Sequence, residues 1–303
     1  YATVTRNADS DEIVEMGLLK QAGAVAFTNG RSAVANAKTL SRALKYALAF
    51  DALIVQHPEE ASLSNGGVMQ SGELATRLGL PGIPREAETI MIDRDLALVK
   101  MTGGRYHAAH ISTAESVAKI RAAKADGLRV TCDTAPPYFA LNELAVGEYR
   151  TFAKLSPPLR TEDDRQAIVA GLADGTIDCI ASDHLPQDQE SKRLPFEQAE
   201  FGAAGLESLL ALTLELVHNG HLEISAALAK VTARPAELLN LPVGRLHVGG
   251  AADIVIFDPE TPNRIEPDSF RSKSKNSPFD GRLVQGRVIR TIVDGRTIYT
   301  AAS

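Results

Sequence analysis

The sequence has little cysteine, no long hydrophobic run and no excess of basic residues, and each shortage excludes a class of protein. Only two of its 303 residues are cysteines, Cys132 and Cys179. Both lie inside short hydrophobic stretches, so we interpret them as reduced, buried thiols of a cytoplasmic protein. No apolar run approaches the ~20 residues that cross a bilayer, and we find no signal-peptide pattern. The formal net charge is −6 without a basic stripe, which argues against nucleic acid and membranes as partners.

Short hydrophobic runs alternate with helical patterns over most of the chain, which predicts a parallel α/β sheet. Six runs are typical of buried strands: 1–5, 23–28, 52–57, 105–111, 128–133 and 177–183. A closed (β/α)8 barrel has eight strands, so we expect a barrel whose first strands are missing from this chain. The sequence starts at Tyr1 within a strand-like run, which we also expect of a chain without its N-terminal portion.

The pattern changes near residue 244, where short alternating strands separated by glycine turns replace the longer helices. We therefore predict two domains, a partial barrel over 1–240 and a small β domain over 241–303. Two long segments, 58–104 and 184–205, interrupt the barrel pattern and are expected to be functional or interface-forming loops at its mouth.

Three predicted barrel strands end in side chains that can bind a metal. These are His57, His110 and Asp183. In a (β/α)8 barrel the C-terminal ends of the strands carry the chemistry, and two imidazoles with a carboxylate suggest a metal-dependent hydrolase. Asp183 would act as the base that takes a proton from the attacking water and returns it to the leaving nitrogen.

Each of these residues also has a structural interpretation, since a single histidine at a strand end is often a hydrogen-bonded core residue. The coincidence of three strand ends favours the ligand interpretation. Side chains alternate along a strand, so only one of His107 and His110 should face the barrel interior, and His110 is the better ligand. The pair Glu59 and Glu60, after His57, is either part of a solvated loop or a support behind the site.

Nine segments, in order along nearly the whole chain, match one known family. They are 23–28, 67–73, 78–84 with Ala87 and Glu88, 107–113, 154–160, 174–178, 181–186, 201–207 and 250–253. On these segments the chain resembles the dihydroorotase family of the amidohydrolase superfamily, of the type that associates with aspartate transcarbamoylase. The resemblance implies a (β/α)8 barrel with a small β domain. It also implies reversible hydrolysis of dihydroorotate to N-carbamoyl-aspartate in pyrimidine biosynthesis.

The resemblance also implies roles for individual residues. His57 and His110 match zinc-binding histidines of the family, and Asp183 matches its metal ligand and general base. Ser156 stands where the family usually has a substrate-binding asparagine. The pair Phe201 and Gly202 matches a loop whose backbone contacts the substrate.

Departures from the family pattern concern the metal centre. The family's fourth strand normally ends in two aspartates, of which the second bridges two metals, but Asn29 and Gly30 occupy these positions here. No lysine stands there to replace the bridge, and two dications ~4 Å apart without a bridging anion repel each other strongly. The family's His-x-His ligand pair belongs on a first strand that this chain lacks. We therefore expect one zinc ion more readily than two, or none.

Three functions remain open from the sequence. The first is a dihydroorotase with one zinc at His57, His110 and Asp183, and the second is a non-catalytic subunit that scaffolds aspartate transcarbamoylase. The third, another cyclic-amide hydrolase, is disfavoured by the missing lysine. In each case we expect a homo-oligomer, and in the first a small-molecule substrate.

Overall fold

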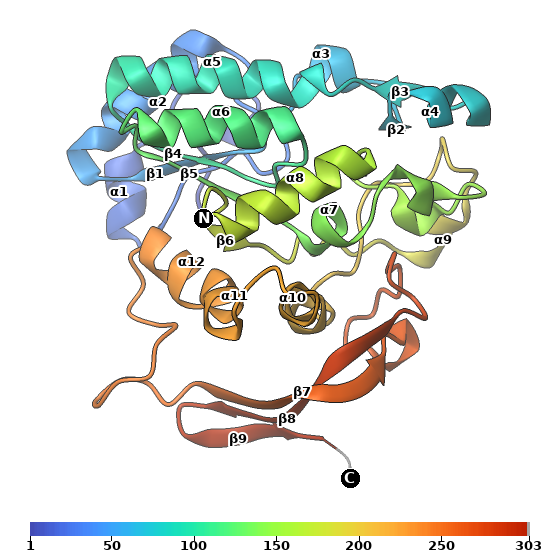
Figure 1. Ribbon diagram of the computed structural model, residues 1–303. Helices are drawn as coiled ribbons and strands as arrows, with labels where there is room; N and C mark the ends of the chain where they lie inside the picture. Colours follow the sequence, from blue (N-terminus) through green and yellow to red (C-terminus); the bar gives the residue numbers. More distant parts are fainter. Residues whose placement is uncertain (302–303) are drawn as a thin grey trace.

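Six strand positions, each parallel to the next, form an arc in the computed structural model, which describes residues 1–301 (Figure 1). Four are regular strands paired in the order β1-β4-β5-β6, namely β1 (Leu53–Gln56), β4 (Arg105–Ala108), β5 (Val130–Thr134) and β6 (Cys179–Ile180). Beyond β1, Phe27 bridges in parallel to Ile54, and Ala2 bridges in parallel to Phe27. The positions follow one another in chain order, as predicted for a (β/α)8 barrel.

Helices cover the outer face of this arc, and α2, α5 and α6 lie side by side over it (Figure 1). The helices of this layer are α1 (Met16–Gln21), α2 (Ala37–Ala47), α5 (Glu86–Thr102), α6 (Ala114–Ala125) and α8 (Glu162–Ala173). Side chains from both layers form one core that includes Phe27, Ile54, Tyr106, Ile120 and Ile168, all fully buried. Burial of such side chains, at roughly 1.5–3 kcal/mol each, holds the helices on the sheet.

Local signals set the ends of two of these helices. Thr113 caps α6, because its Oγ1 accepts a hydrogen bond from the backbone N–H of Ser116 at 3.2 Å. The helix α8 ends at Ala173, and Gly175 follows with a φ of +82°, a left-handed conformation that favours glycine.

The segment 58–104 was expected to be a long loop, and this expectation is wrong for its second half. Residues Glu86–Thr102 form α5, whose buried side chains pack against α2 and α6. The first half holds only short elements, namely α3 (Ala61–Ser64), β2 (Met69–Gln70), α4 (Glu73–Leu78) and β3 (Gly82–Ile83). Charged and apolar residues are mixed along α5 without a clear amphipathic stripe, so the sequence does not reveal the helix. Packing against neighbouring helices stabilises it.

The first two predicted strands, 1–5 and 23–28, are reduced to isolated bridges. The Asn29 side chain explains part of this, because its Oδ1 accepts hydrogen bonds from the backbone N–H groups of Val4 and Thr5, at 3.0 and 3.2 Å. These backbone groups are satisfied by a side chain instead of by a neighbouring strand.

A second layer completes the molecule below the barrel helices (Figure 1). It contains α10 (Leu209–His218), α11 (Ile224–Val231), α12 (Ala233–Leu238) and an antiparallel sheet of β7 (Ile254–Arg264), β8 (Leu283–Val293) and β9 (Arg296–Thr300). The sheet is the predicted small β domain, and β8 packs against α10. The boundary between 240 and 241 remains a prediction.

Shorter helices connect these layers. They are α7 (Pro136–Ala140), α9 (Gln189–Arg193) and the 3₁₀ helices Arg6–Ala8, Leu48–Phe50, Glu143–Val146, Thr151–Ala153 and Pro267–Ser269. Within residues 1–301, none of the helices has the length and apolar character needed to cross a membrane.

Candidate active site at the strand ends

The three predicted metal ligands meet at the C-terminal ends of the parallel strands. His57 follows β1, His110 follows β4, and Asp183 follows β6. The ring centroids of His57 and His110 lie 6.1 Å apart, and His110 Nε2 lies 3.7 Å from Asp183 Oδ1. The structure therefore brings these side chains to one place, at the edge of the barrel where (β/α)8 enzymes carry out their chemistry.

Two of these residues have strained backbones. His110 and Asp183 have φ values of 57° and 43°, in the left-handed region that residues other than glycine rarely adopt. Such a conformation costs roughly 1–3 kcal/mol and persists only where the surroundings enforce it. Each residue lies in the turn that follows a strand, and this turn directs its side chain toward the site.

Asp133 on β5 is a site residue that the sequence analysis missed. Its carboxylate lies 2.8 Å from His107 Nε2 and 2.9 Å from His110 Nδ1, and it accepts a hydrogen bond from the backbone N–H of His110 at 2.7 Å. It occupies the C-terminal end of a parallel strand, the same signal that singled out His57 and Asp183. The expectation that alternation separates His107 from His110 is wrong, because β4 ends at Ala108 and the turn beyond it brings both imidazoles to one carboxylate.

The charges in this cluster shift the pKa values of His110 and Asp133. Burial alone would lower the pKa of His110, but the charges of Asp133 and Asp183 raise it to about 9. Burial would raise the pKa of Asp133, but the neighbouring His110 and His107 hold it well below its usual range. In the absence of a metal ion, the two carboxylates therefore favour the protonated form of His110.

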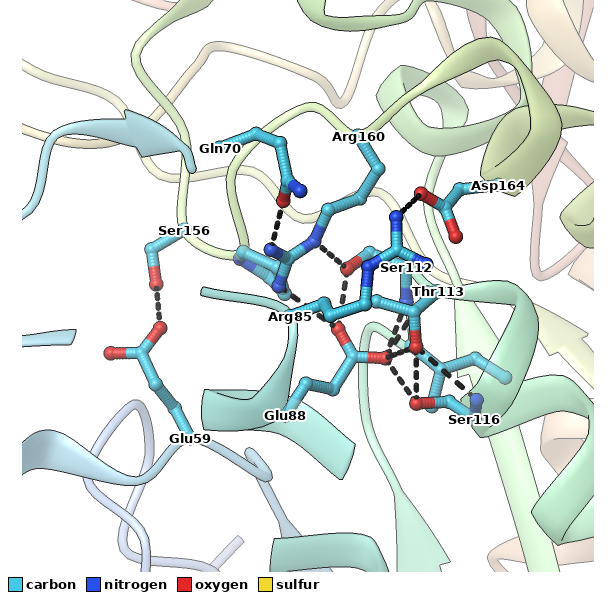
Figure 2. Close-up of polar contacts among 12 residues, drawn as sticks. Glu59, Gln70, Arg85, Glu88, Ser112, Thr113, Ser116, Ser156, Arg160 and Asp164 are labelled. Carbon is cyan, nitrogen blue, oxygen red and sulfur yellow. Dashed lines mark hydrogen bonds and ion pairs between the residues drawn. The ribbon is translucent and has the colours of Figure 1, made fainter. Parts of the chain in front are cut away.

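A second group of contacts surrounds His57. Its Nε2 lies 3.3 Å from Ser156 Oγ and 3.9 Å from Glu59 Oε2. Ser156 Oγ in turn donates a hydrogen bond to Glu59 at 3.1 Å (Figure 2). Burial would raise the pKa of Glu59, but hydrogen bonding and charge from His57, with the hydroxyls of Ser64 and Ser156, lower it to about 2. Glu59 is thus an ionised support behind the site, which decides between its two interpretations.

Arg31 supplies a cation at this site that the sequence analysis did not foresee. Its Nη1 lies 3.2 Å from Asp183 Oδ1, and its Nη2 donates a hydrogen bond to the backbone carbonyl of Ser156. Tyr138 donates a hydrogen bond to the other oxygen of Asp183 at 3.4 Å. The only feature of the sequence that points to Arg31 is its position in the turn 28–31. There it follows Gly30, which stands where the family has its metal-bridging aspartate.

The residues of this turn do not fit a two-metal centre. Gly30 has no side chain to bridge two ions, and the amide of Asn29 bonds to the backbone of Val4 and Thr5 instead of facing the site. Without a bridging anion, two dications would repel each other.

The donor types are suitable for one ion, and the Nδ1 atom of His57 is buried without a hydrogen-bond partner. However, no group of three or more His, Cys, Asp or Glu side chains within residues 1–301 is arranged to hold a metal ion. Asp183 is paired with Arg31 instead. The chain thus carries residues that can bind one ion, but these residues are not arranged around a single metal position.

A cavity of about 420 Å³ opens beside this site, with Arg31, Glu59, Ser156 and Phe201 in its walls. Two of the three predicted substrate-binding residues, Ser156 and Phe201, therefore border one cavity. The third, Gly202, has both backbone groups engaged: its N–H donates to the Lys154 carbonyl at 3.0 Å, and its carbonyl accepts from Asn276 at 2.9 Å. Its φ of +122° favours glycine at this position.

A buried network centred on Glu88 lies behind the site (Figure 2). The Glu88 carboxylate, on α5, accepts hydrogen bonds from backbone and hydroxyl groups of Ser112 and Thr113, just after His110. It also lies 3.5 Å from Arg160 Nη2, and Arg160 donates to Ser112 Oγ at 3.0 Å. One buried carboxylate thus connects the turn that carries His110 to the segment that carries Ser156.

In fold the chain is an amidohydrolase. It matches the solved L-hydantoinase (dihydropyrimidinase) from Arthrobacter aurescens with a TM-score of 0.84 and 27% identity over 95% of this chain and 68% of that one. The dihydropyrimidinase from Brevibacillus agri matches with a TM-score of 0.78 and 25% identity over 88% of this chain and 60% of that one. A model of the amidohydrolase family also matches residues 210–299.

Within that class, the chain belongs to the dihydroorotase family. A dihydro-orotase-like family model matches residues 1–116. The dihydroorotase of Anaplasma phagocytophilum is 47% identical over 99% of this chain and 67% of its own length. That of Syntrophus aciditrophicus is 45% identical over 98% of this chain and 70% of its own. The chain therefore spans about two thirds of these relatives, and the family is generally metal-dependent.

Proposed function

We propose that the protein hydrolyses and forms the cyclic amide of dihydroorotate, with N-carbamoyl-aspartate as the open product, in pyrimidine biosynthesis. The observation that carries this proposal is the convergence of His57, His110 and Asp183 beside one cavity, in a member of the dihydroorotase family. A cavity of about 420 Å³ is of the size that small-molecule sites have, roughly 300–1,000 Å³.

One zinc ion is the cofactor in this proposal, with His57, His110 and Asp183 as its ligands. When bound, zinc lowers the pKa of water and polarises a carbonyl group. To bind the ion, Asp183 would have to break its ion pair with Arg31, whose Nη1 lies 3.2 Å from Asp183 Oδ1. The buried, unpartnered Nδ1 atom of His57 supports its assignment as a ligand, and the position of His110 Nε2, 3.7 Å from Asp183 Oδ1, supports that of His110.

Asp183 is the catalytic residue. Water adds to the ring carbonyl carbon, Asp183 accepts the proton of that water, and the carbon–nitrogen bond breaks as Asp183 returns the proton to the leaving nitrogen. Ser156 and Phe201 bind the substrate, and their position in the cavity wall supports this role. Because both backbone groups of Gly202 are engaged, its part is to shape the loop.

A second candidate function is a non-catalytic subunit that scaffolds aspartate transcarbamoylase. Two observations favour it. Gly30 has no side chain at the position of the metal-bridging residue, and the carboxylate of Asp183, a predicted metal ligand, is paired with Arg31. In either function we expect a homo-oligomer in the cytoplasm.

The test is cyclisation of N-carbamoyl-aspartate by the full-length protein, with and without added zinc, beside a His57→Ala variant. We expect zinc-dependent turnover in the wild type and at least a 100-fold loss in the variant, because a missing ligand weakens metal binding. If the wild type is inert with added zinc and retains less than a tenth of an equivalent of metal, the catalytic proposal is wrong. Co-purification with an aspartate transcarbamoylase would then support the scaffold.

A further inference from the structure

Two buried lysines join the predicted loop 184–205 to the segment that carries Ser156. Lys192 lies on α9 within that loop, and Lys154 lies two residues before Ser156. They are 3% and 2% exposed. Neither forms an ion pair with a carboxylate in the part of the chain that the structure describes, and the hydrogen-bond acceptors of both ammonium groups are backbone carbonyls. Lysine is rarely buried to this extent without a partner of opposite charge.

The hydrogen bonds of Lys192 reach from the loop to the neighbouring segment. Its Nζ donates to the backbone carbonyls of Thr151 and Lys154, at 2.9 and 3.4 Å. It also donates to the carbonyl of Glu200, within the loop, at 2.6 Å. These three acceptors use all three donors of the ammonium group. Because Glu200 directly precedes Phe201, the last bond holds the backbone just before a wall of the cavity.

Lys154 contacts the same wall directly. Its Nζ lies 4.6 Å from the centre of the Phe201 ring, within the range of a cation–π contact, and donates a hydrogen bond to the Glu197 carbonyl at 2.9 Å. The backbone carbonyl of Lys154 accepts a hydrogen bond from the N–H of Gly202 at 3.0 Å. The Phe201 ring and the backbone on both sides of it are therefore held by this pair of lysines.

The stability of the fold does not by itself explain two buried cations here. Burial, together with the charge of Lys154, lowers the pKa of Lys192 to about 8, and burial also lowers the pKa of Lys154. A lysine pKa below its usual value means that the surroundings disfavour the ammonium form. The carbonyl groups thus do not fully offset the cost of burying the two charges. Groups with such shifts are found more often at functional sites than elsewhere.

We propose that Lys154 and Lys192 are positioning residues that hold Phe201 in place as a wall of the cavity beside the candidate active site. They act through the loop and through the ring, since neither lysine borders that cavity. The expected effect on turnover rests on the proposed function. The placement of Phe201 is measurable without turnover.

The first test is ¹⁹F NMR of the full-length protein grown with 4-fluorophenylalanine, in which a Phe201→Leu variant identifies the Phe201 signal. We expect Lys154→Met and Lys192→Met each to move or broaden that signal, while the signals of phenylalanines remote from the loop stay in place. Methionine is close to lysine in length and can be buried without a charge, and thermal unfolding checks that each variant is folded. Lys45→Met, at an exposed position on α2, is the matched control and should leave the signal unchanged.

The second test is the kinetics of N-carbamoyl-aspartate cyclisation by the same variants. We expect KM to rise about 10-fold with little change in kcat, because a displaced wall weakens binding of the substrate and of the transition state alike. A loss of global stability alone would move neither KM nor the Phe201 signal of the protein that remains folded.

The outcomes separate this inference from the proposed function. If the wild type shows no turnover, the catalytic proposal is wrong, and the Phe201 signal alone decides the inference. An unchanged Phe201 signal in both lysine variants overturns the inference, whatever the turnover. In an active protein, an unchanged KM in both variants also overturns it. Failure of both variants to fold would show a purely structural role and overturn it as well.

Discussion

Asp133 holds two imidazoles in place. It lies 2.8 Å from His107 Nε2 and 2.9 Å from His110 Nδ1, and its pKa is held low by their charges. On the other side of His110, Asp183 lies 3.7 Å away and is paired with Arg31. At the residue scale, the site is therefore a chain of alternating charges from Asp133 to Arg31.

Removing Asp133 should destabilise the protein as well as the site. Asp133→Ala leaves the largely buried His110 beside one carboxylate fewer. We expect the free energy of unfolding to fall by about 3 kcal/mol, as when one partner of a buried pair is lost. Denaturant unfolding at pH 7 measures this. Asp9→Ala, at an exposed position, is the control and should stay within about 0.5 kcal/mol of wild type. A loss below 1 kcal/mol for Asp133→Ala would contradict the role assigned to it.

At the scale of elements, helices of the outer layer position the turns that carry the site. Glu88 on α5 binds the start of α6 and, through Arg160, the segment before α8 (Figure 2). The turns after β4 and before α8 carry His110 and Ser156. A buried polar network of this kind stabilises one arrangement of these turns only if every polar group in it has a hydrogen-bond partner.

Glu88→Ala should therefore cost more than an ordinary surface change. It leaves Arg160, which is 4% exposed, without its buried counter-charge, and the hydroxyls of Ser112 and Thr113 without their acceptor. We expect a loss of about 3–5 kcal/mol. Glu88→Gln, which keeps an acceptor and the shape, should lose less. Thermal unfolding of both variants beside Glu86→Ala, an exposed neighbour on α5, provides the comparison. Equal stability of Glu88→Ala and Glu86→Ala would show that the network is not needed.

At the scale of the whole molecule, the antiparallel sheet is joined to the barrel by an exposed segment and by packing. Residues 241–249 are exposed throughout, whereas β8 contacts α10 and Val284 belongs to the main core. The hydrophobic core therefore includes residues on both sides of the proposed domain boundary between 240 and 241. We infer that the two parts unfold as one unit.

Limited trypsin digestion checks this. Arg245 is the one Lys or Arg in 241–253 and its side chain is 63% exposed, so we expect an early cut after it. The two fragments should still elute together in gel filtration and part only in denaturant, because α10 and β8 share buried surface. Arg245→Gln should remove that cut. Fragments that separate without denaturant would contradict a shared core.

The sequence by itself determined the alternation of strands and helices, the order of the six strand positions and the C-terminal positions of His57, His110 and Asp183. These follow from local hydrophobic pattern and from the rule that parallel strands point the same way, which needs no coordinates. Only the tertiary structure decided which charges meet. Asp133 joins His107 and His110 across neighbouring strands, and Arg31 reaches an aspartate 152 residues away. Such contacts depend on turn geometry and on the register between strands, which no local pattern encodes.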